Sequence, residues 1–170
     1  SGIDLAAAEI AMMDIEDRSY IMKKSIAAVK SQYDYIVIDC PPSLGLIVIN
    51  ALVASDYTLI PVEAHYLSFE SMKVMLDTVD MVKKKLNPKL EIAGIFLTKY
   101  QSRTNLSKAI WELVTSKYGN TIKVFSDYIP YSIKVAEQSL YGKSIVEMYP
   151  DHPVSVAYMK MAKELINYGK

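Results

Sequence analysis

Short runs of apolar residues recur along the chain, separated by longer stretches that are apolar on one stripe only. Runs of the first kind fit strands that are covered on both faces, as in a parallel sheet. Stretches of the second kind fit amphipathic helices, in which apolar residues return every three or four positions. We predict strands at residues 35–39, 57–63, 92–98 and 122–129, the last less regular because it contains Ser126 and Asp127.

The predicted helices lie between and beyond these strands. They fall at residues 5–13, 18–30, 44–54, 67–86, 105–118, 133–140 and 154–167. Residues 44–54 are apolar on every side, which predicts a helix that is buried or lies in an interface. The alternation of strands and helices predicts an α/β fold, with a parallel sheet, right-handed crossovers and helices on both faces.

Composition limits the possible functions. At 170 residues the chain is long enough for one domain with a core, and we expect a single domain over residues 1–170. Basic and acidic residues balance at 19 each, so any contact with DNA must come from a local patch. The single cysteine, Cys40, excludes an intrachain disulfide, and we expect it to be buried at a strand tip. We find no signal peptide and no apolar run of about 18 residues, and we expect a cytoplasmic protein.

The first predicted strand ends in an acid. Asp39 would lie at the carboxyl tip of the strand, where open α/β sheets bind their ligands. Pro41 and Pro42 cannot continue a ladder of hydrogen bonds, so the chain must leave the sheet there. Proteins that transfer phosphate hold Mg²⁺ beside a nucleotide with an acid in this place, often through water. We therefore predict that Asp39 serves such a metal.

This stretch also carries a family resemblance. The sequence YIVIDCPPSLG at residues 35–45, with the apolar residues that follow, resembles the Walker B segment of the ParA/Soj partition ATPases, within the MinD-like group. The resemblance covers nearly the whole chain, in the family's order and spacing. It continues at residues 59–62, 97–98, 103–106, 129–130 and 142–145. It implies a P-loop-NTPase-like fold.

Two motifs of that family are absent from these 170 residues. No G-x-x-x-x-G-K-[ST] phosphate loop can be read from any glycine, and Gly142-Lys143-Ser144 lacks the earlier glycine and predicts a turn. The family's strand that ends in an aspartate shortly after the phosphate loop is missing too. We therefore expect the C-terminal two-thirds of a ParA-like ATPase domain, an incomplete fold without its N-terminal strands. We expect its unpaired sheet edges to favour contact with another chain.

The resemblance implies a role for several residues in nucleotide binding and hydrolysis. Asp39 is implied as the catalytic Walker B acid, polarising a water on Mg²⁺, and the loop from Pro41 to Gly45 as the switch that senses the γ-phosphate. The nucleotide-binding positions it implies are Asp39, Pro41, Pro42, Lys99, Pro130 and Tyr131. Tyr131 departs from the arginine that is common at this place in the family. ATP and Mg²⁺ are the cofactors implied for the complete protein, and we expect none bound to this chain.

The resemblance also implies macromolecular partners. Arg103 and Lys134 match positions whose basic side chains contact DNA phosphates in ParA relatives, and such contacts need only positive charge. The complete protein is expected to form a homodimer, to bind DNA without sequence preference and to meet a ParB-like protein. We expect no membrane partner, because the predicted helix at residues 154–167 has too few lysines for a basic anchor.

Two alternatives remain open at this stage. The first is a non-catalytic module that dimerises or binds a partner through its sheet edges, because the phosphate loop is absent. A MinD-like regulator acting at the membrane is the other, although the final helix fits docking onto the sheet better than membrane binding. A phosphate loop immediately before Ser1 in the gene would decide for the ATPase.

Overall fold

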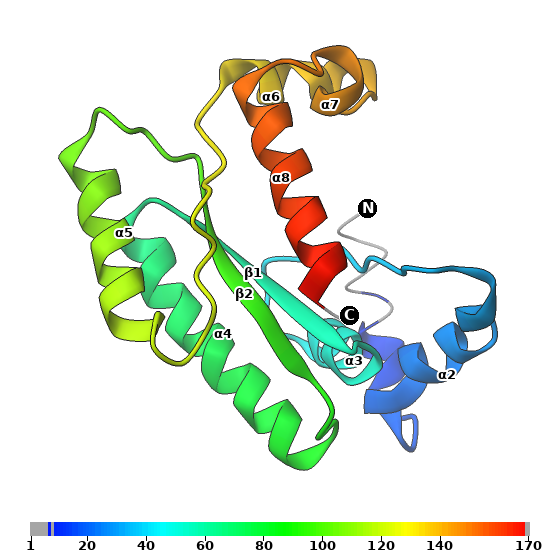
Figure 1. The fold of residues 1–170 in the computed structure, drawn as a ribbon. Coiled ribbons are helices and arrows are strands. Elements are labelled where there is room, and N and C mark those ends of the chain that lie inside the picture. The colour runs from blue at the N-terminus through cyan, green and yellow to red at the C-terminus, as the bar shows by residue number, and fades with distance from the viewer. Residues whose placement is uncertain (1–6, 8, 169–170) are drawn as a thin grey trace. The chain divides into compact units, whose positions relative to one another are not determined.

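The computed structural model describes residue 7 and residues 9–168, with the side chain of Ser139 excepted. The chain divides into two compact units. The first holds the described residues up to 58 together with residues 74–91, and the second holds residues 59–73 and 92–168. Helix α4 (Tyr66–Lys85) contributes residues to both units (Figure 1).

Helix α3 (Leu46–Ala54) is largely buried in the first unit. Its residues Val48, Ala51, Leu52 and Val53 are almost fully buried, which confirms the prediction from its all-round apolar sequence. Between residues 18 and 32, three short helical elements precede it in this unit. They are η1 (Arg18–Tyr20), α2 (Ile21–Ala27) and η2 (Lys30–Gln32), and they replace the single helix predicted at residues 18–30.

Two buried asparagines connect α3 to the elements around it. Asn50 is fully buried, and its Nδ2 donates to the carbonyl oxygens of Arg18 at 2.8 Å and Leu46 at 3.0 Å. Its Oδ1 accepts from the amide of Met22 at 3.1 Å. The side chain of Asn50 thus joins α3 to η1 and α2 through backbone groups, and a buried polar group satisfied in this way contributes net stability.

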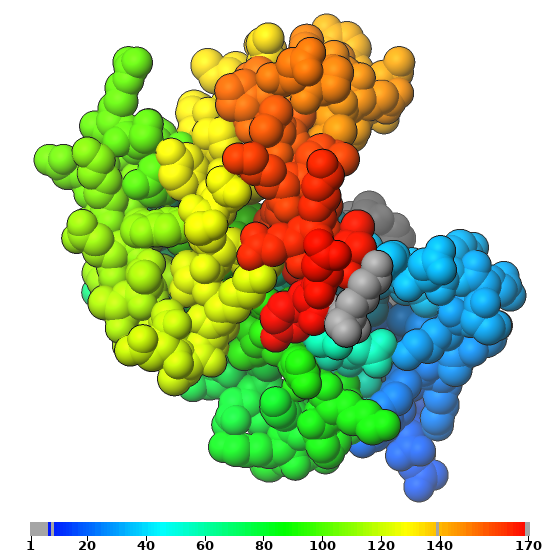
Figure 2. All heavy atoms as spheres, in the orientation of Figure 1, coloured from blue at the N-terminus to red at the C-terminus, as the bar shows by residue number. Residues whose placement is uncertain are grey.

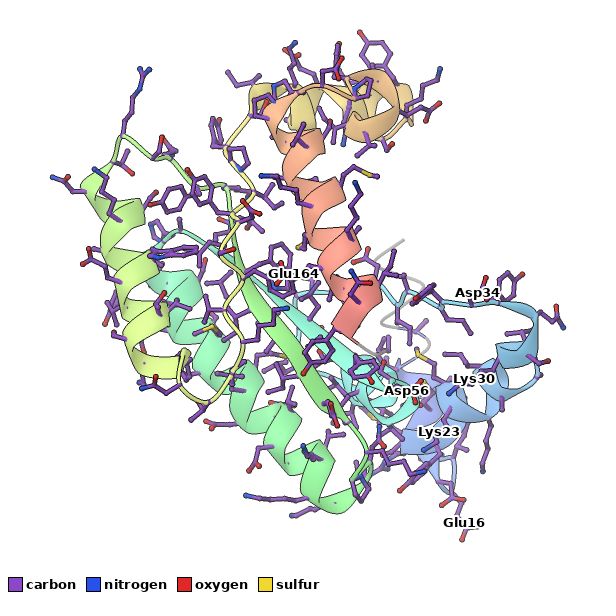
Figure 3. All side chains as sticks on the ribbon, in the orientation of Figure 1. Glu16, Lys23, Lys30, Asp34, Asp56 and Glu164 are labelled. Atoms are coloured by element: carbon purple, nitrogen blue, oxygen red, sulfur yellow. The ribbon has the colours of Figure 1, made fainter. Side chains whose placement is uncertain are left out.

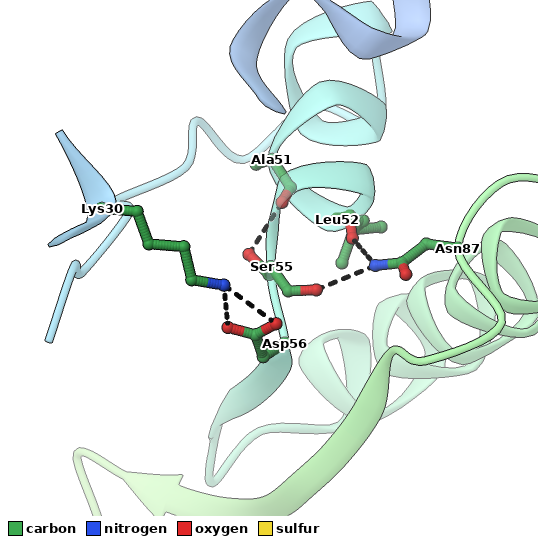
Figure 4. A network of polar contacts seen from close by, with 6 residues as sticks. All are labelled: Lys30, Ala51, Leu52, Ser55, Asp56 and Asn87. Atoms are coloured by element: carbon green, nitrogen blue, oxygen red, sulfur yellow. Dashed lines mark hydrogen bonds and ion pairs between the residues drawn. The ribbon is translucent and has the colours of Figure 1, made fainter. Parts of the chain in front are cut away.

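The second asparagine, Asn87, follows the end of α4. Its Nδ2 donates to the carbonyl oxygens of Leu52 at 3.1 Å and Ser55 at 2.8 Å (Figure 4). The hydroxyl of Ser55 donates to Ala51, and Lys30 pairs with Asp56 at 3.0 Å. The last carbonyls of α3 therefore find partners at the point where the chain turns into the next strand.

The strand predicted at residues 35–39 is not formed. These residues are extended, but none of the described residues pairs with them in a ladder. Tyr35 is 62% exposed and Val37 is 91% exposed. A strand needs a neighbour that takes up its backbone donors and acceptors, and its apolar residues need a cover. The expectation that Cys40 is buried is wrong for the same reason, since Cys40 is exposed.

The second unit is built on two parallel strands, β1 (Tyr57–Glu63) and β2 (Glu91–Thr98), as predicted. Residues 122–129 were predicted as a further strand, but they do not form a regular one. An isolated parallel bridge joins Val124 to Ile95 of β2, and a second joins Pro130 to Tyr100, just beyond both segments. The amide of Phe125 donates to Ile95, and the amide of Ile129 donates to Leu97. The segment therefore advances by four residues while β2 advances by two. Residues 126–128 bulge out of the ladder, and the regular strand is lost there.

Gly94 allows this segment to approach β2 closely. It has a φ of 156°, which residues with a side chain rarely adopt. A Cβ at this position would lie 2.5 Å from the ring of Phe125, and both observations require glycine. The Phe125 ring contacts Phe96 edge-on, with centroids 6.5 Å apart.

Helices complete the second unit. They are α5 (Asn105–Tyr118), α6 (Ile133–Gln138), η3 (Ser139–Tyr141), α7 (Ile145–Met148) and α8 (Pro153–Tyr168). Thr104 caps α5, and its hydroxyl accepts from the amide of Ser107 at 3.3 Å.

Helix α8 docks on one face of β2. Its residues Val154 and Ala157 share a buried cluster with Phe96, Phe125 and Ile129. In Figure 2 the red atoms of α8 lie beside the yellow atoms of the segment that carries Phe125. The neighbours of Phe96 along the strand point to the opposite face and are fully buried as well, so both faces are covered. The docking predicted for the last helix is confirmed. No helix in the described part of the chain is long and apolar enough to cross a membrane.

Candidate functional site

The carboxyl ends of β1 and β2 bring two charged residues together. Glu63 is the last residue of β1, and Lys99 follows β2 with a φ of 50°. The Nζ of Lys99 donates to Oε1 of Glu63 and forms an ion pair with it. Both side chains are about half exposed, so solvent screens the pair and its net contribution to stability is about 1 kcal/mol or less. An ammonium group thus lies at the sheet edge where open α/β folds bind ligands.

Three of the residues implied in nucleotide binding meet at this edge. The amide of Tyr100 donates to Ile129 at 3.0 Å, and the amide of Tyr131 donates to Tyr100 at 2.9 Å. These two bonds place Lys99 on one backbone segment and Pro130 and Tyr131 on the adjacent one. The structure therefore brings Lys99, Pro130 and Tyr131 together, which their separation in the sequence left open.

A cavity of about 490 Å³ opens beside them. This volume lies within the usual range for small-molecule sites. Its lining combines residues that follow β2, residues of the segment at 127–130 and residues at the start of α8. The lining residues are Tyr100, Ser102, Asp127, Tyr128, Pro130, Asp151, Pro153, Val156, Ala157 and Lys160. Lys160 and Asp127 face each other at 3.7 Å, so the cavity offers a cation and an acid next to apolar surface.

Aromatic rings form one wall of the cavity. Tyr100 stacks on Tyr128 with centroids 3.9 Å apart, and both rings meet Trp111 edge-on at 6.3 Å. Burial, followed by the charges of Tyr128 and Glu112, raises the pKa of Tyr100. Its hydroxyl therefore stays protonated at neutral pH. Stacked rings with fixed geometry suit a flat ring system as ligand.

Sequence reasoning missed most of this cavity. Asp127, Asp151 and Lys160 carry no motif, and their side chains meet only because α8 packs onto the segment at residues 122–129. Pro130 is the member of the implied nucleotide set that lines it. Periodicity could predict α8, but not where its first two turns would lie.

The acid implied as catalytic belongs to the first unit. Asp39 is exposed and ends the extended, unpaired segment, and Pro41 and Pro42 follow it without regular structure. Asp34, at the start of this segment, is labelled in Figure 3. Although Cys40 is exposed, partial desolvation of its thiol, followed by the nearby charge of Asp39, raises its pKa, so the thiol is a poor nucleophile at neutral pH.

The structure shows no built metal site around Asp39 in the described part of the chain. Among the described residues there is no group of three or more His, Cys, Asp or Glu side chains that could hold a metal ion. Mg²⁺ needs no such group, because it keeps several waters and binds through one or two carboxylates and the phosphates of its substrate. A lone exposed carboxylate therefore agrees with the role implied for Asp39.

The two residues implied in DNA binding are both exposed. Arg103 lies in the turn between β2 and α5, and Lys134 lies in the first turn of α6. The Nζ of Lys134 is 4.5 Å from the centre of the Tyr149 ring, which holds the ammonium group by a cation–π interaction. Both charges are thus available to phosphate groups.

Comparison with known proteins identifies the family. A family model described as AAA domain matches residues 1–92. The chain is 41% identical over 167 residues to the sporulation initiation inhibitor protein Soj of Bacillus subtilis, and 37% identical over 166 residues to the chromosome-partitioning ATPase Soj of Treponema pallidum. The chain belongs to the ParA/Soj-type ATPases. Each alignment covers 98% of the chain and 65% of the relative, so the chain spans less than two thirds of these relatives.

The fold agrees with this membership. The crystal structure of cobyrinic acid a,c-diamide synthase from Mycobacterium smegmatis, with a bound ATP analogue and magnesium, matches with a TM-score of 0.84 and 28% identity. The match covers 99% of the chain and 61% of the synthase. The parallel strands and the helices of this ParA/Soj-type chain therefore form part of an α/β P-loop fold, incomplete as predicted.

Proposed function

We propose that the intact protein is a ParA-type partition ATPase that binds ATP and Mg²⁺ at the carboxyl end of its sheet. The observation that carries this proposal is the meeting of Lys99, Pro130 and Tyr131 at that edge, beside a cavity with stacked rings. Three residues that the family resemblance implies lie together at the edge where open α/β sheets bind nucleotides. Residues 1–170 act as the C-terminal two-thirds of one ATPase domain.

The implied nucleotide-binding residues of each unit serve a different part of the nucleotide. The cavity beside Tyr100 and Tyr128 accepts the base, because stacked rings and apolar surface suit a flat heterocycle. Lys99 precedes Tyr100, which lines the cavity, and its charge attracts the ribose-phosphate portion. In the first unit, Asp39 would hold a water of the metal, and Pro41 and Pro42 stiffen the loop that follows. The metal, when bound, neutralises charge that develops on the transferred phosphoryl group.

The complete protein would use this site to control assembly on DNA. ATP binding favours a homodimer, and the dimer binds DNA phosphates without sequence preference through Arg103 and Lys134. A ParB-like protein stimulates hydrolysis and releases the DNA. Such a protein works in the cytoplasm, associated with the nucleoid. The 170 residues contain no phosphate-loop motif, so we expect negligible hydrolysis by this chain alone.

Photolabelling tests the proposed site. The intact protein is irradiated with 8-azido-ATP and Mg²⁺, and labelled peptides are mapped by mass spectrometry. We expect label on peptides that contain residues 99–104 or 126–131, and we expect excess ATP to abolish it. Label that maps only outside these peptides would contradict the placement of the base. Labelling that excess ATP does not reduce would contradict nucleotide binding itself.

A further inference from the structure

The carboxylate of Glu9 lies at the N-terminus of α3. The amide of Ile47, in the first turn of the helix, donates to Oε1 of Glu9 at 3.3 Å. Within the described residues the helix has no other side-chain cap at this end, because its N-cap residue is Gly45 and its first turn contains no acid. The first amides of a helix have no partner within it, and the positive end of its dipole attracts a carboxylate. Glu9 therefore caps α3 from 38 residues away in the sequence.

A second observation places the same carboxylate. A Cβ at Gly45 would lie 1.9 Å from Oε1 of Glu9 and 2.9 Å from its Cδ. The backbone of Gly45 has a φ of −84°, which any residue can adopt, so its conformation does not require glycine. The requirement is space, because the Glu9 carboxylate occupies the place that a side chain at position 45 would take.

We propose that Glu9 is a positioning residue that fixes the loop from Pro41 to Gly45 by capping α3. Residues 9–12 are helical, so the cap ties one helical segment to the end of the loop. The loop cannot change its exit into α3 without breaking this bond or moving residues 9–12. If the loop senses the γ-phosphate, which rests on the proposed function, residues 9–12 respond to the nucleotide through Glu9.

Amide hydrogen exchange tests the cap without any nucleotide, so its result is independent of the proposed function. We expect Glu9→Ala to speed exchange of the Ile47 amide about fivefold, the usual size of a lost helix cap. Glu16→Ala is the matched control, because Glu16 is an exposed acid a few residues along the same chain (Figure 3). It should leave exchange at Ile47 unchanged. Equal rates in the wild type and Glu9→Ala would overturn the proposal.

A double-variant cycle separates positioning from general loss of stability. Gly45→Ala should push the carboxylate away and speed exchange at Ile47 by a similar factor. Adding Glu9→Ala to Gly45→Ala should then change nothing further, because the bond is already broken. Additive effects would mean that the two residues act separately, and the proposal would fail. If Glu9→Ala does not fold, Glu9→Gln replaces it and should show a smaller increase at Ile47, since a neutral oxygen accepts less strongly.

Discussion

The two units of this chain differ in how many of their candidate site residues lie on hydrogen-bonded backbone segments. The unit with the clearer sequence motif has the less well-paired backbone. In the second unit, Lys99, Pro130 and Tyr131 carry no distinctive motif, yet paired backbone segments hold them in place. In the first unit, Asp39 ends the sequence that identifies the family most clearly, yet it lies on an exposed segment without a strand partner. A sequence motif indicates the function of a segment, but not its secondary structure. Whether that segment forms a strand depends on the neighbouring strands.

The largest expected effect lies in the well-paired unit. Phe125→Ala removes a ring that is 1% exposed and packs against Phe96 and Gly94. We expect the free energy of unfolding to fall by about 3–5 kcal/mol, through lost burial and the cavity left behind. Urea denaturation followed by circular dichroism measures it. A loss below about 1 kcal/mol would show that this unit is packed no better than the first.

The next largest effect is expected on ATP hydrolysis, from a change in the first unit. Asp39→Asn in the intact protein keeps the shape of the side chain and removes its charge. We expect ATP hydrolysis to fall about 100-fold or more, because metal-assisted stabilisation contributes several kcal/mol and each 1.36 kcal/mol is tenfold in rate. Stability should change little, since the residue is exposed.

Asp34→Asn is the matched control for this variant. Asp34 is an exposed acid at the other end of the same segment (Figure 3). It should hydrolyse ATP at the wild-type rate in a steady-state phosphate-release assay. Equal losses of ATP hydrolysis in the two variants would show that Asp39 is an ordinary surface acid.

A smaller effect is expected for DNA binding. Changing Arg103 and Lys134 together to alanine should weaken binding of the intact protein equally for all DNA sequences, because phosphate contacts carry no sequence information. The slope of log K against log salt should fall by about two, since each contact contributes roughly one. Fluorescence anisotropy over a salt series measures the slope. Lys117→Ala with Lys108→Ala, on α5, is the charge-matched control.

The smallest effect is expected in the unpaired segment. Val37→Ala removes two methyl groups from a side chain that is 91% exposed, so the free energy of unfolding of this chain should change by less than about 0.5 kcal/mol. The same change in the intact protein should cost about 1–3 kcal/mol if further strands cover the segment there. Equal small losses in both would mean that the segment stays exposed in the intact protein.

The sequence predicted those elements whose partners lie within the described residues. Strands β1 and β2 and helices α4, α5 and α8 fall within one or two residues of their predicted bounds, because their apolar patterns match the surfaces they meet. The segment at residues 35–39 has an equally clear pattern, but pairing is a property of two segments. Residues 122–129 lost their regular ladder because three consecutive residues bulge, which periodicity does not reveal.

The site could be predicted only in part for a related reason. Family resemblance pointed to Lys99, Pro130 and Tyr131, and adjacent backbone segments bring them together. Lys160 and Asp127 are 33 positions apart in the sequence and meet through the packing of α8, which depends on Phe96 and Phe125. Contacts of this kind follow from how helices pack, and no local pattern encodes them.

The ring cluster at the cavity wall has a spectroscopic consequence. Trp111 is the single tryptophan of the chain, and it touches both Tyr100 and Tyr128, which line the cavity. Excitation at 295 nm therefore reports from this place alone. A ligand that enters the cavity must disturb one of the two tyrosines, and the indole emission should change with it. The protein carries its own fluorescent probe, one ring away from the proposed base site.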